Sequence, residues 1–354
     1  MNNKEVVLSG IRATGNLHLG NYYGALSKFV KMQNDYDCLF FIADLHALTT
    51  NPEPDALHAN VKNILAEYLA AGIDPEKATI FVQSDVPEIS EMYLLLNMHV
   101  GIGELMRTAS FKDKARKQLG IKTGNDDEDI EKQIIGTDSN KRVNAGLLTY
   151  PTLMAVDILI QKAHKVPVGK DQEQHLELTR RFARRFNSFY GVDLFPEPQN
   201  FNFGDHAVKV PGLDGSGKMG KSEGNCIYLI DEEKALRKKV MRAVTDEGPK
   251  EPNQPISAPV QNLLTLMELT SAPEIVQSYR DAYADCSIRY GDMKKQLAED
   301  ILKVTTPIRE RYHDICNDDA YISRVVREGA ERARERASKT LSEVREVMGI
   351  RRFW

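Results

Sequence analysis

Short apolar runs alternate with longer helical patterns through the first half of the chain. The runs are continuous, as in strands buried on both faces, whereas the longer segments space their apolar residues three or four positions apart. Predicted strands lie at residues 6–8, 38–42 and 79–82, and predicted helices at 19–32 and 57–69. This alternation is typical of parallel βαβ units and predicts a doubly wound α/β sheet.

The pattern changes twice further along the chain. Charged residues replace large apolar ones between about 112 and 145, which predicts an exposed insertion. Beyond it we expect a helix at 147–160, a strand at 165–168, a helix at 172–186 and a last strand at 227–230. The rest of the chain shows only amphipathic helical patterns. We therefore expect an α/β domain over residues 1–230 and an all-helical domain over 231–354.

Composition narrows the classes of protein that this chain can represent. It has 354 residues, 47 basic and 51 acidic side chains and a net charge of −4, with no apolar stretch long enough to span a membrane. The N-terminus has no apolar signal region, so a cytoplasmic location is expected. The four cysteines are widely spaced and form no C-x-x-C pair, so their spacing fits neither a disulfide framework nor a cysteine metal site.

The last 34 residues have the opposite charge balance. Residues 321–354 contain nine basic and five acidic side chains, an excess of four positive charges. Such an excess fits either a solvated helix face or a surface that binds nucleic acid. The same helix could instead pack on the α/β domain, and the sequence leaves these alternatives open.

Two glycine-rich segments carry the candidate chemistry. The first strand leads into a loop with Gly10, Gly15 and Gly20, and His18 begins the following helix with Asn21 close by. Free N–H groups at a helix start favour phosphate binding, although a structural turn with a capping histidine would use the same residues. Residues 215–222 satisfy the pattern of a P-loop, but the next residues lack the helix that a P-loop requires.

Taken together, the two segments resemble the signature motifs of class I aminoacyl-tRNA synthetases. The motifs are His18-Leu19-Gly20-Asn21 and Lys218-Met219-Gly220-Lys221-Ser222. Segments 44–49, 146–151, 154–159 and 166–175 resemble the tryptophanyl branch of that class, so the resemblance covers nearly the whole chain. Gly220 stands where serine is usual, which is expected to loosen the loop, Arg12 where glutamine is common, and Leu8 where phenylalanine is frequent.

The resemblance implies a fold, a reaction and partners. The fold would be a Rossmann-like catalytic domain followed by a helical domain that binds the tRNA anticodon. The reaction would join L-tryptophan to ATP as tryptophanyl-adenylate and transfer the acyl group to tRNA(Trp), releasing AMP and pyrophosphate. Mg²⁺ would arrive on the ATP phosphates, no iron–sulfur cluster would be present, and the enzyme would be a homodimer.

The resemblance also assigns roles to individual residues. The catalytic group would comprise His18, Lys114, Lys218 and Lys221. The ATP site would comprise Arg12, Ala13, Thr14, Gly20, Asn21, Gly169, Lys170, Asp171, Val210, Met219, Gly220 and Ser222. The tryptophan site would comprise Gly10, His46, Tyr150, Met154, Asp157, Val166, Val168 and Gln172.

Asp157 carries the expectation of tryptophan as substrate. It shares one helix face with Tyr150 and Met154 among apolar neighbours, where a carboxylate is costly without a hydrogen-bond donor such as an indole N–H. Two rival interpretations remain: a tyrosine-charging relative, and an RNA-binding descendant without catalysis. Tyrosyl relatives of archaeal type place glutamine where Met154 stands, and a descendant freed from catalysis would not need both lysines and His18.

Overall fold

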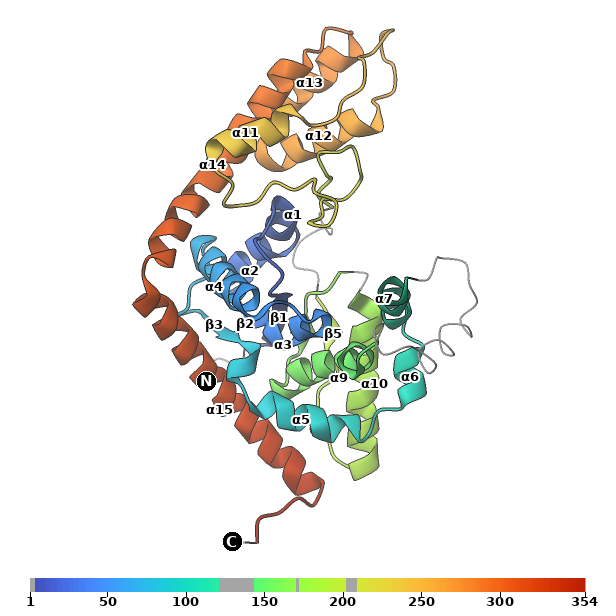
Figure 1. Cartoon of the computed structure of the whole chain (residues 1–354), viewed down its shortest axis with the longest axis vertical. Helices are drawn as coiled ribbons and strands as arrows, with labels where there is room; N and C mark the ends of the chain where they lie inside the picture. The colour runs from blue at the N-terminus through green and yellow to red at the C-terminus, as the bar shows by residue number, and fades with distance from the viewer. Residues whose placement is uncertain (1–3, 121–142, 170–171, 202–208, 354) are drawn as a thin grey trace.

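The computed structural model describes residues 4–120, 143–169, 172–201 and 209–353, and within them a parallel sheet of five strands forms the centre of the α/β part (Figure 1). The strands are β1 (Val6–Arg12), β2 (Asp37–Ala43), β3 (Ala78–Val82), β4 (Lys165–Val166) and β5 (Gln199–Asn200). Their order is β3-β2-β1-β4-β5, and every neighbouring pair is parallel. The chain thus builds outward from β1 in both directions, which confirms the predicted doubly wound sheet and puts the switch point between β1 and β4.

Helices connect these strands in the first two thirds of the chain. The elements are α1 (Leu19–Asn21), η1 (Tyr22–Leu26), α2 (Ser27–Met32), α3 (Asp44–Ala47), η2 (Leu48–Thr50), α4 (Pro54–Ala70), η3 (Gln83–Asp85), α5 (Glu88–Asn97), α6 (Ile102–Met106), α7 (Ala109–Leu119), α9 (Ala145–Ile160) and α10 (Glu173–Tyr190). The single helix predicted at 19–32 is present as α1, η1 and α2 in succession, with a π-helical turn in η1. Most of the predicted insertion lies outside the described residues.

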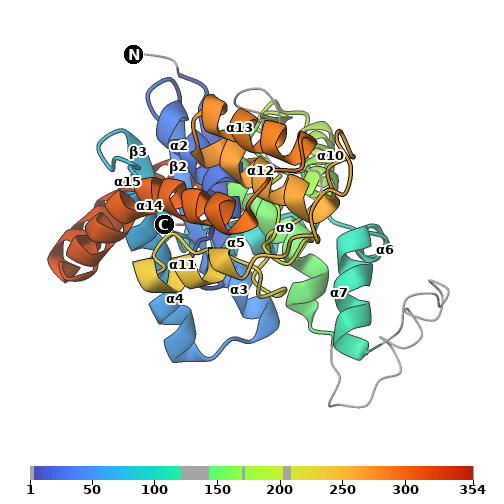
Figure 2. The same ribbon diagram turned by 90° about the horizontal axis from the view of Figure 1, so that it is seen from above.

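The remainder of the described chain is helical, as predicted. Its elements are α11 (Glu233–Met241), α12 (Ala258–Thr270), α13 (Pro273–Ala284), α14 (Tyr290–Cys316) and α15 (Asp319–Val347). Figure 2 shows α11, α12 and α13 grouped together beside α14. In the part of the chain that the structure describes, no helix is both long and apolar enough to cross a membrane.

The predicted strand at 227–230 is wrong. Its residues hydrogen-bond the first loop, with Leu19 N donating to Ile227 O at 2.9 Å and Leu229 N donating to Leu17 O at 2.9 Å. Only one antiparallel bridge, between His18 and Tyr228, results, because the partner segment turns directly into α1. The apolar run therefore fastens the two glycine-rich segments together instead of extending the sheet.

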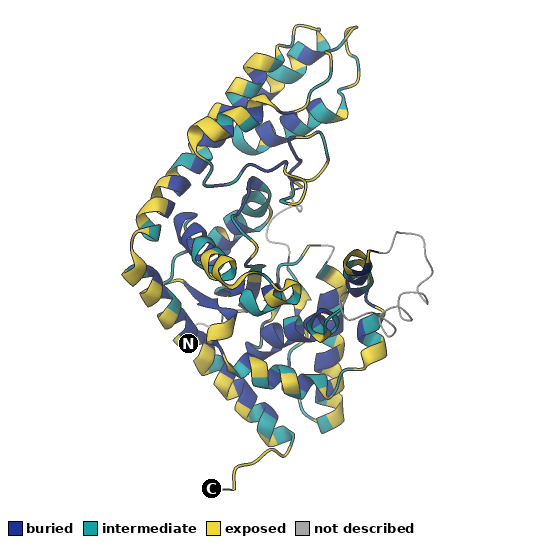
Figure 3. Ribbon diagram, in the orientation of Figure 1, coloured by how far each residue is buried: buried dark blue, intermediate teal, exposed yellow. Residues whose placement is uncertain are grey.

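Apolar side chains alternate between the two faces of the sheet and build a core on each. Val7, Phe40 and Ile80 belong to the cluster shared with α4 and α14, and Leu8 and Phe41 belong to the cluster shared with α5, α9 and α10. Figure 3 shows buried positions concentrated on the helix faces turned toward the sheet. Both faces are covered, as expected for parallel strands with continuous apolar runs.

The long helix α15 covers the β3 edge of the sheet (Figure 1). Ile322 and Val325 join one core cluster, whereas Ala330 and the residues after it join the other, so the helix crosses from face to face. At the crossing, a Cβ atom on Gly329 would overlap the carbonyl oxygen of Ile80. Glycine at this position lets the helix lie directly against the strand backbone.

Candidate active site

A pocket of about 620 Å³ lies at the switch point of the sheet, bounded by the end of β1, the first loop, α9 and the segment after β4. Ligands bind at such points because the strands and helices on either side diverge there. The sequence-predicted residues that line it are Gly10, Arg12, Thr14, His18, Asn21, His46, Lys114, Tyr150, Met154, Asp157, Val166, Val168, Gly169, Gln172 and Lys221. Both glycine-rich segments thus contribute to one cavity.

Other predicted residues lie outside this lining. Lys218 and Ser222 are exposed, whereas Ala13, Val210 and Met219 are buried. Gly20 and Gly220 also lie outside the lining, and both are partly buried. Lys170 and Asp171 lie outside the described residues.

His18 is held at the start of α1 by a reciprocal pair of hydrogen bonds. Its Nδ1 accepts from Asn21 N at 3.3 Å, and its own N donates to Asn21 Oδ1 at 3.1 Å. A Cβ on Gly20 would come within 2.8 Å of the imidazole, so the ring needs the space that glycine leaves. Burial, reinforced by Lys221 and Lys218, lowers the pKa of His18 to about 4. At neutral pH the ring is uncharged, and with Nδ1 accepting, Nε2 carries the proton it can donate.

Lys221 reaches across to the first loop. Its Nζ donates to Gly15 O at 2.7 Å and to Thr14 O at 3.2 Å. Burial lowers the pKa of Lys221, and the nearby carboxylate of Glu67 opposes that shift. An ammonium held on neutral carbonyls keeps its charge available to an anion in the pocket.

Asn225 organises the loop that carries Lys218 and Lys221, and the sequence did not single it out. Its Nδ2 donates to Asp214 Oδ1 at 2.9 Å and to Lys218 O at 3.1 Å, while its Oδ1 accepts from Gly220 N at 2.9 Å. Asn225 is buried, so these bonds are shielded from water. The backbone at Gly220 is therefore hydrogen-bonded without a serine side chain.

Asp157 is a buried carboxylate in the lining of the same pocket. His46 Nε2 is 3.0 Å from its Oδ2, and Gln83 Nε2 donates to its Oδ1 at 2.8 Å and its Oδ2 at 3.0 Å. Burial raises the pKa of Asp157, and the hydrogen bonds from His46 and Gln83 oppose that rise. Gln83 was missed by the sequence reasoning, although its place directly after β3 is where parallel sheets carry ligand-binding residues.

His175 connects several side chains along the wall formed by α9 and α10. Its Nε2 is 2.6 Å from Tyr150 Oη and 2.7 Å from Ser110 Oγ, and its Nδ1 is 2.8 Å from Gln172 Oε1. His175 is fully buried, and the sequence did not predict this role. The network fixes the Tyr150 ring in the pocket wall, since a buried hydroxyl with a partner has one preferred orientation.

Two further cations face the pocket. Lys114 Nζ lies 4.0 Å from the centre of the Tyr150 ring, and burial together with the charge of Arg12 lowers the pKa of Lys114 to about 8. The Nε of Arg12 is buried and has no hydrogen-bond partner among the described residues. Within the described ranges, no three His, Cys, Asp or Glu side chains converge as metal ligands. The lining of the pocket thus combines cations that can bind a polyanion with a buried carboxylate.

Glycine-rich segments and cations at the switch point of a doubly wound sheet are the arrangement with which many enzymes bind nucleotides. The chain belongs to the class I tRNA synthetases for tryptophan and tyrosine, because the model of that family matches residues 1–305.

Among individual proteins, the chain is similar to ligases and synthetases for tryptophan. The chain is 60% identical over 347 residues to a tryptophan–tRNA ligase of Porphyromonas gingivalis, covering 98% of this chain and 100% of that protein. It is 39% identical to a tryptophan–tRNA ligase of Fusobacterium nucleatum, covering 97% of each. The tryptophanyl-tRNA synthetase of Campylobacter jejuni, solved in complex with ADP and tryptophan, superposes with a TM-score of 0.82 at 31% identity, covering 97% of this chain and 99% of that one.

Proposed function

We propose that this protein is a tryptophan–tRNA ligase that activates L-tryptophan with ATP and transfers it to tRNA(Trp). The observation that carries the proposal is the position of Asp157 in the same cavity as Arg12, Lys114 and Lys221. A single pocket thus offers an acceptor for an indole N–H and cations for a triphosphate. The test is ATP–pyrophosphate exchange with each of the twenty amino acids, with activation of tryptophan above all others as the expected result.

Adenylate formation needs positioning and charge neutralisation, not a protein nucleophile. A carboxylate oxygen of tryptophan forms a bond to the α-phosphorus of ATP while the bond from that phosphorus to the pyrophosphate oxygen breaks. Charge grows on the leaving pyrophosphate, and Lys221, Lys114 and Arg12 are the pocket cations that can neutralise it. His18 Nε2–H can donate to a phosphate oxygen, and Mg²⁺ enters with ATP as part of the substrate.

Recognition of the indole is assigned to Asp157 and the apolar residues around it. Its carboxylate has about four acceptor positions. His46 and Gln83 approach it at three short distances, which leaves capacity for one indole N–H. The thioether of Met154 and the side chains of Val166 and Val168 line the same cavity and can pack on the ring. The phenol of tyrosine would need an acceptor and a donor, which this arrangement does not match as well.

We propose that the enzyme is a homodimer, and an exposed apolar patch supports this proposal. Leu94, Met98, Ile102 and Phe189 are 56%, 67%, 66% and 71% exposed, and Phe189 stacks edge-on against His99, the residue that follows Met98. Apolar residues gathered on one face of a monomer commonly mark an interface. A second copy presenting the same patch would cover all four side chains in both subunits.

The patch predicts a change in assembly state. The double variant Met98→Glu, Phe189→Glu should sediment as a monomer where the wild type sediments as a dimer, because four charges would enter the interface. Met241→Glu, at a residue 40% exposed on α11, is the matched control and should leave the dimer intact. A double variant that stays dimeric would place the interface elsewhere.

We also propose that the helical part beyond about residue 240 contacts tRNA. Arg334, Arg336 and Arg345 of α15 are paired with Glu88, Asp37 and Glu91 of the α/β part, with shortest N–O distances of 3.5, 2.5 and 3.1 Å. These pairs support packing of α15 on the sheet, one of the alternatives left open by the sequence. The RNA contacts are therefore assigned to other basic residues, of which Arg242, Arg289 and Arg311 are exposed.

Salt titration tests this assignment. Binding of tRNA should weaken with added salt along a straight log–log plot, and Arg311→Gln should reduce the slope by roughly one unit if it contacts one phosphate. Arg336→Gln, which removes a cation already paired with Asp37, is the matched control and should leave the slope unchanged. An affinity independent of salt would contradict tRNA binding through phosphate contacts.

The cytoplasmic location and the domain boundary near residue 230 stay predictions.

A further inference from the structure

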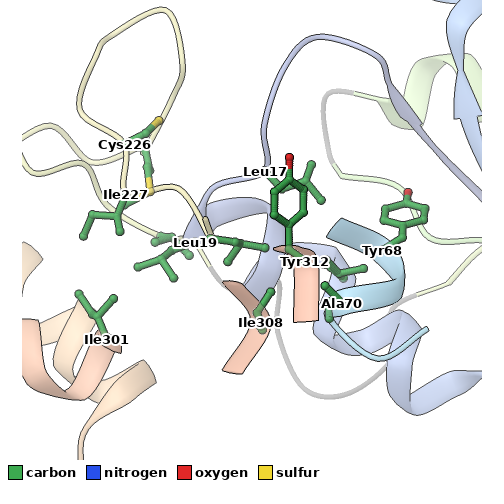
Figure 4. Close-up of a cluster of buried hydrophobic side chains, with 14 of the residues drawn as sticks. Leu17, Leu19, Tyr68, Ala70, Cys226, Ile227, Ile301, Ile308 and Tyr312 are labelled. Atoms are coloured by element: carbon green, nitrogen blue, oxygen red, sulfur yellow. The ribbon is translucent and has the colours of Figure 1, made fainter. Parts of the chain in front are cut away.

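A carboxylate is buried directly beneath the first glycine-rich loop. Glu67, near the end of α4, has no exposed surface, and its Oε2 and Oε1 accept from Leu17 N at 2.9 and 3.1 Å. Figure 4 shows Leu17 and Tyr312 beside Tyr68, the residue that follows Glu67, in one buried cluster contributed by the first loop, α4 and α14. No part of the mechanism above uses this carboxylate.

Stability alone does not account for an acidic side chain at this position. Burying a carboxylate costs several kcal/mol unless partners offset it, and well-packed apolar residues often replace buried charges at no loss. Burial raises the pKa of Glu67 to about 8, and the hydrogen bond from Leu17 and the charge of Lys221 only partly oppose that rise. The chain therefore retains a group that lowers the free energy of unfolding as the pH rises from about 4.5, its ordinary pKa, to about 8, its pKa in the fold.

The partners of Glu67 connect it to the site. Leu17 immediately precedes His18, so the carboxylate fixes the backbone from which the imidazole projects. Lys221 holds the same loop from the other side, through the carbonyls of Thr14 and Gly15. The ammonium and the carboxylate attract each other across this loop, since each shifts the pKa of the other toward its charged form.

We propose that Glu67 is a positioning residue for adenylate formation, which sets the first loop through Leu17 N–H and supplies the negative charge that draws Lys221 onto that loop. The inference rests on the proposed function. Glu67 does not touch the substrates; it acts through Lys221 and His18. The ionised carboxylate is the form that attracts Lys221, so the effect of Glu67 on the reaction depends on its protonation.

Glu67→Gln separates the charge from the hydrogen bond. The amide oxygen can still accept from Leu17 N, so the variant imitates the protonated carboxyl at every pH. The rates of tryptophan-dependent pyrophosphate exchange by wild type and variant should be nearly equal at pH 6. At pH 9 the kcat of the variant should be about tenfold lower than that of the wild type, with little change in the Kd of tryptophan. The same factor at both pH values, or no difference at either, would overturn the proposal.

The ratio of the two rates isolates Glu67 from the other ionisable groups around it. Lys114, with a pKa of about 8, titrates in both proteins and cancels, while His18 with a pKa of about 4 stays neutral throughout. Burial raises the pKa of Tyr312 on α14, so the phenol also stays neutral. Among the described residues, Lys221 is the charged side chain that shifts the pKa of Glu67, and its coupling to Glu67 is the quantity under test.

Two further variants complete the experiment. Asp300→Asn removes another buried carboxylate, on α14, and should leave exchange at its wild-type rate. In a Lys221→Ala background, adding Glu67→Gln should cause no further loss at pH 9, whereas full additivity would mean that Glu67 does not act through Lys221. Absence of tryptophan-dependent exchange in the wild type would sink the proposed function itself, while normal wild-type exchange with an unaffected Glu67→Gln would sink this inference alone.

Discussion

Lys221→Ala is expected to slow adenylate formation by about 100-fold or more while leaving tryptophan binding nearly intact, because a charge that acts on the transition state is lost. The side chain of Lys221 bonds to the first loop, whereas the carboxylate of Asp157 bonds to His46 and Gln83. Single-turnover formation of the adenylate measures the chemical step, and calorimetry measures tryptophan binding. An unchanged chemical step would mean that Lys221 only stabilises the loop.

A matched control distinguishes loss of this charge from loss of any lysine. Lys234 lies exposed in the first turn of α11, away from the pocket lining. Lys234→Ala should leave both the chemical step and tryptophan binding at their wild-type values.

Asp157→Ala is expected to reduce kcat/KM for tryptophan by about 100-fold and to weaken discrimination against phenylalanine, because the charge-assisted hydrogen bond to the indole is lost. The substitution also leaves His46 Nε2 and Gln83 Nε2 without their acceptor. Pyrophosphate exchange with tryptophan, tyrosine and phenylalanine, run on wild type and variant, measures both effects.

Two results would contradict the role of Asp157 as the indole acceptor. One is a wild type that activates tyrosine better than tryptophan, and the other is an Asp157→Ala variant with unchanged tryptophan kinetics. Asp300→Asn serves here too as a control for removal of a buried carboxylate, because Asp300 bonds to Lys303 and Gln296 away from the pocket.

The sequence was most informative where the pattern was local. The strands β1, β2 and β3 were predicted from continuous apolar runs. The two-residue strand β5, made of Gln199 and Asn200, has no apolar run and was not predicted. The apolar run at 227–230 was interpreted as a strand, but it pairs with the first loop and not with the sheet. A run of this composition can do either, so composition does not distinguish the two.

Residues that act through partners distant in the sequence could not be found in this way. Gln83 meets Asp157 although 74 positions separate them, and Glu67 meets Leu17 across 50 positions. Each is a single polar residue next to an apolar segment, a pattern that is common in helices and strand ends without function. The arginines of α15 show the same limit, since a count of charges does not reveal that Arg336 is paired with Asp37.

The packing of α15 against β3 has a consequence for how the chain folds during synthesis. Strands β1, β2 and β3 are complete by residue 82, but the helix that covers the free edge of β3 does so through Gly329 and its neighbours, nearly 250 residues later. An uncovered parallel edge offers unpaired N–H and C=O groups to any other strand. The β3 edge of the nascent chain therefore stays unpaired and prone to aggregation throughout most of translation. It is covered only when α15 leaves the ribosome and packs on β3.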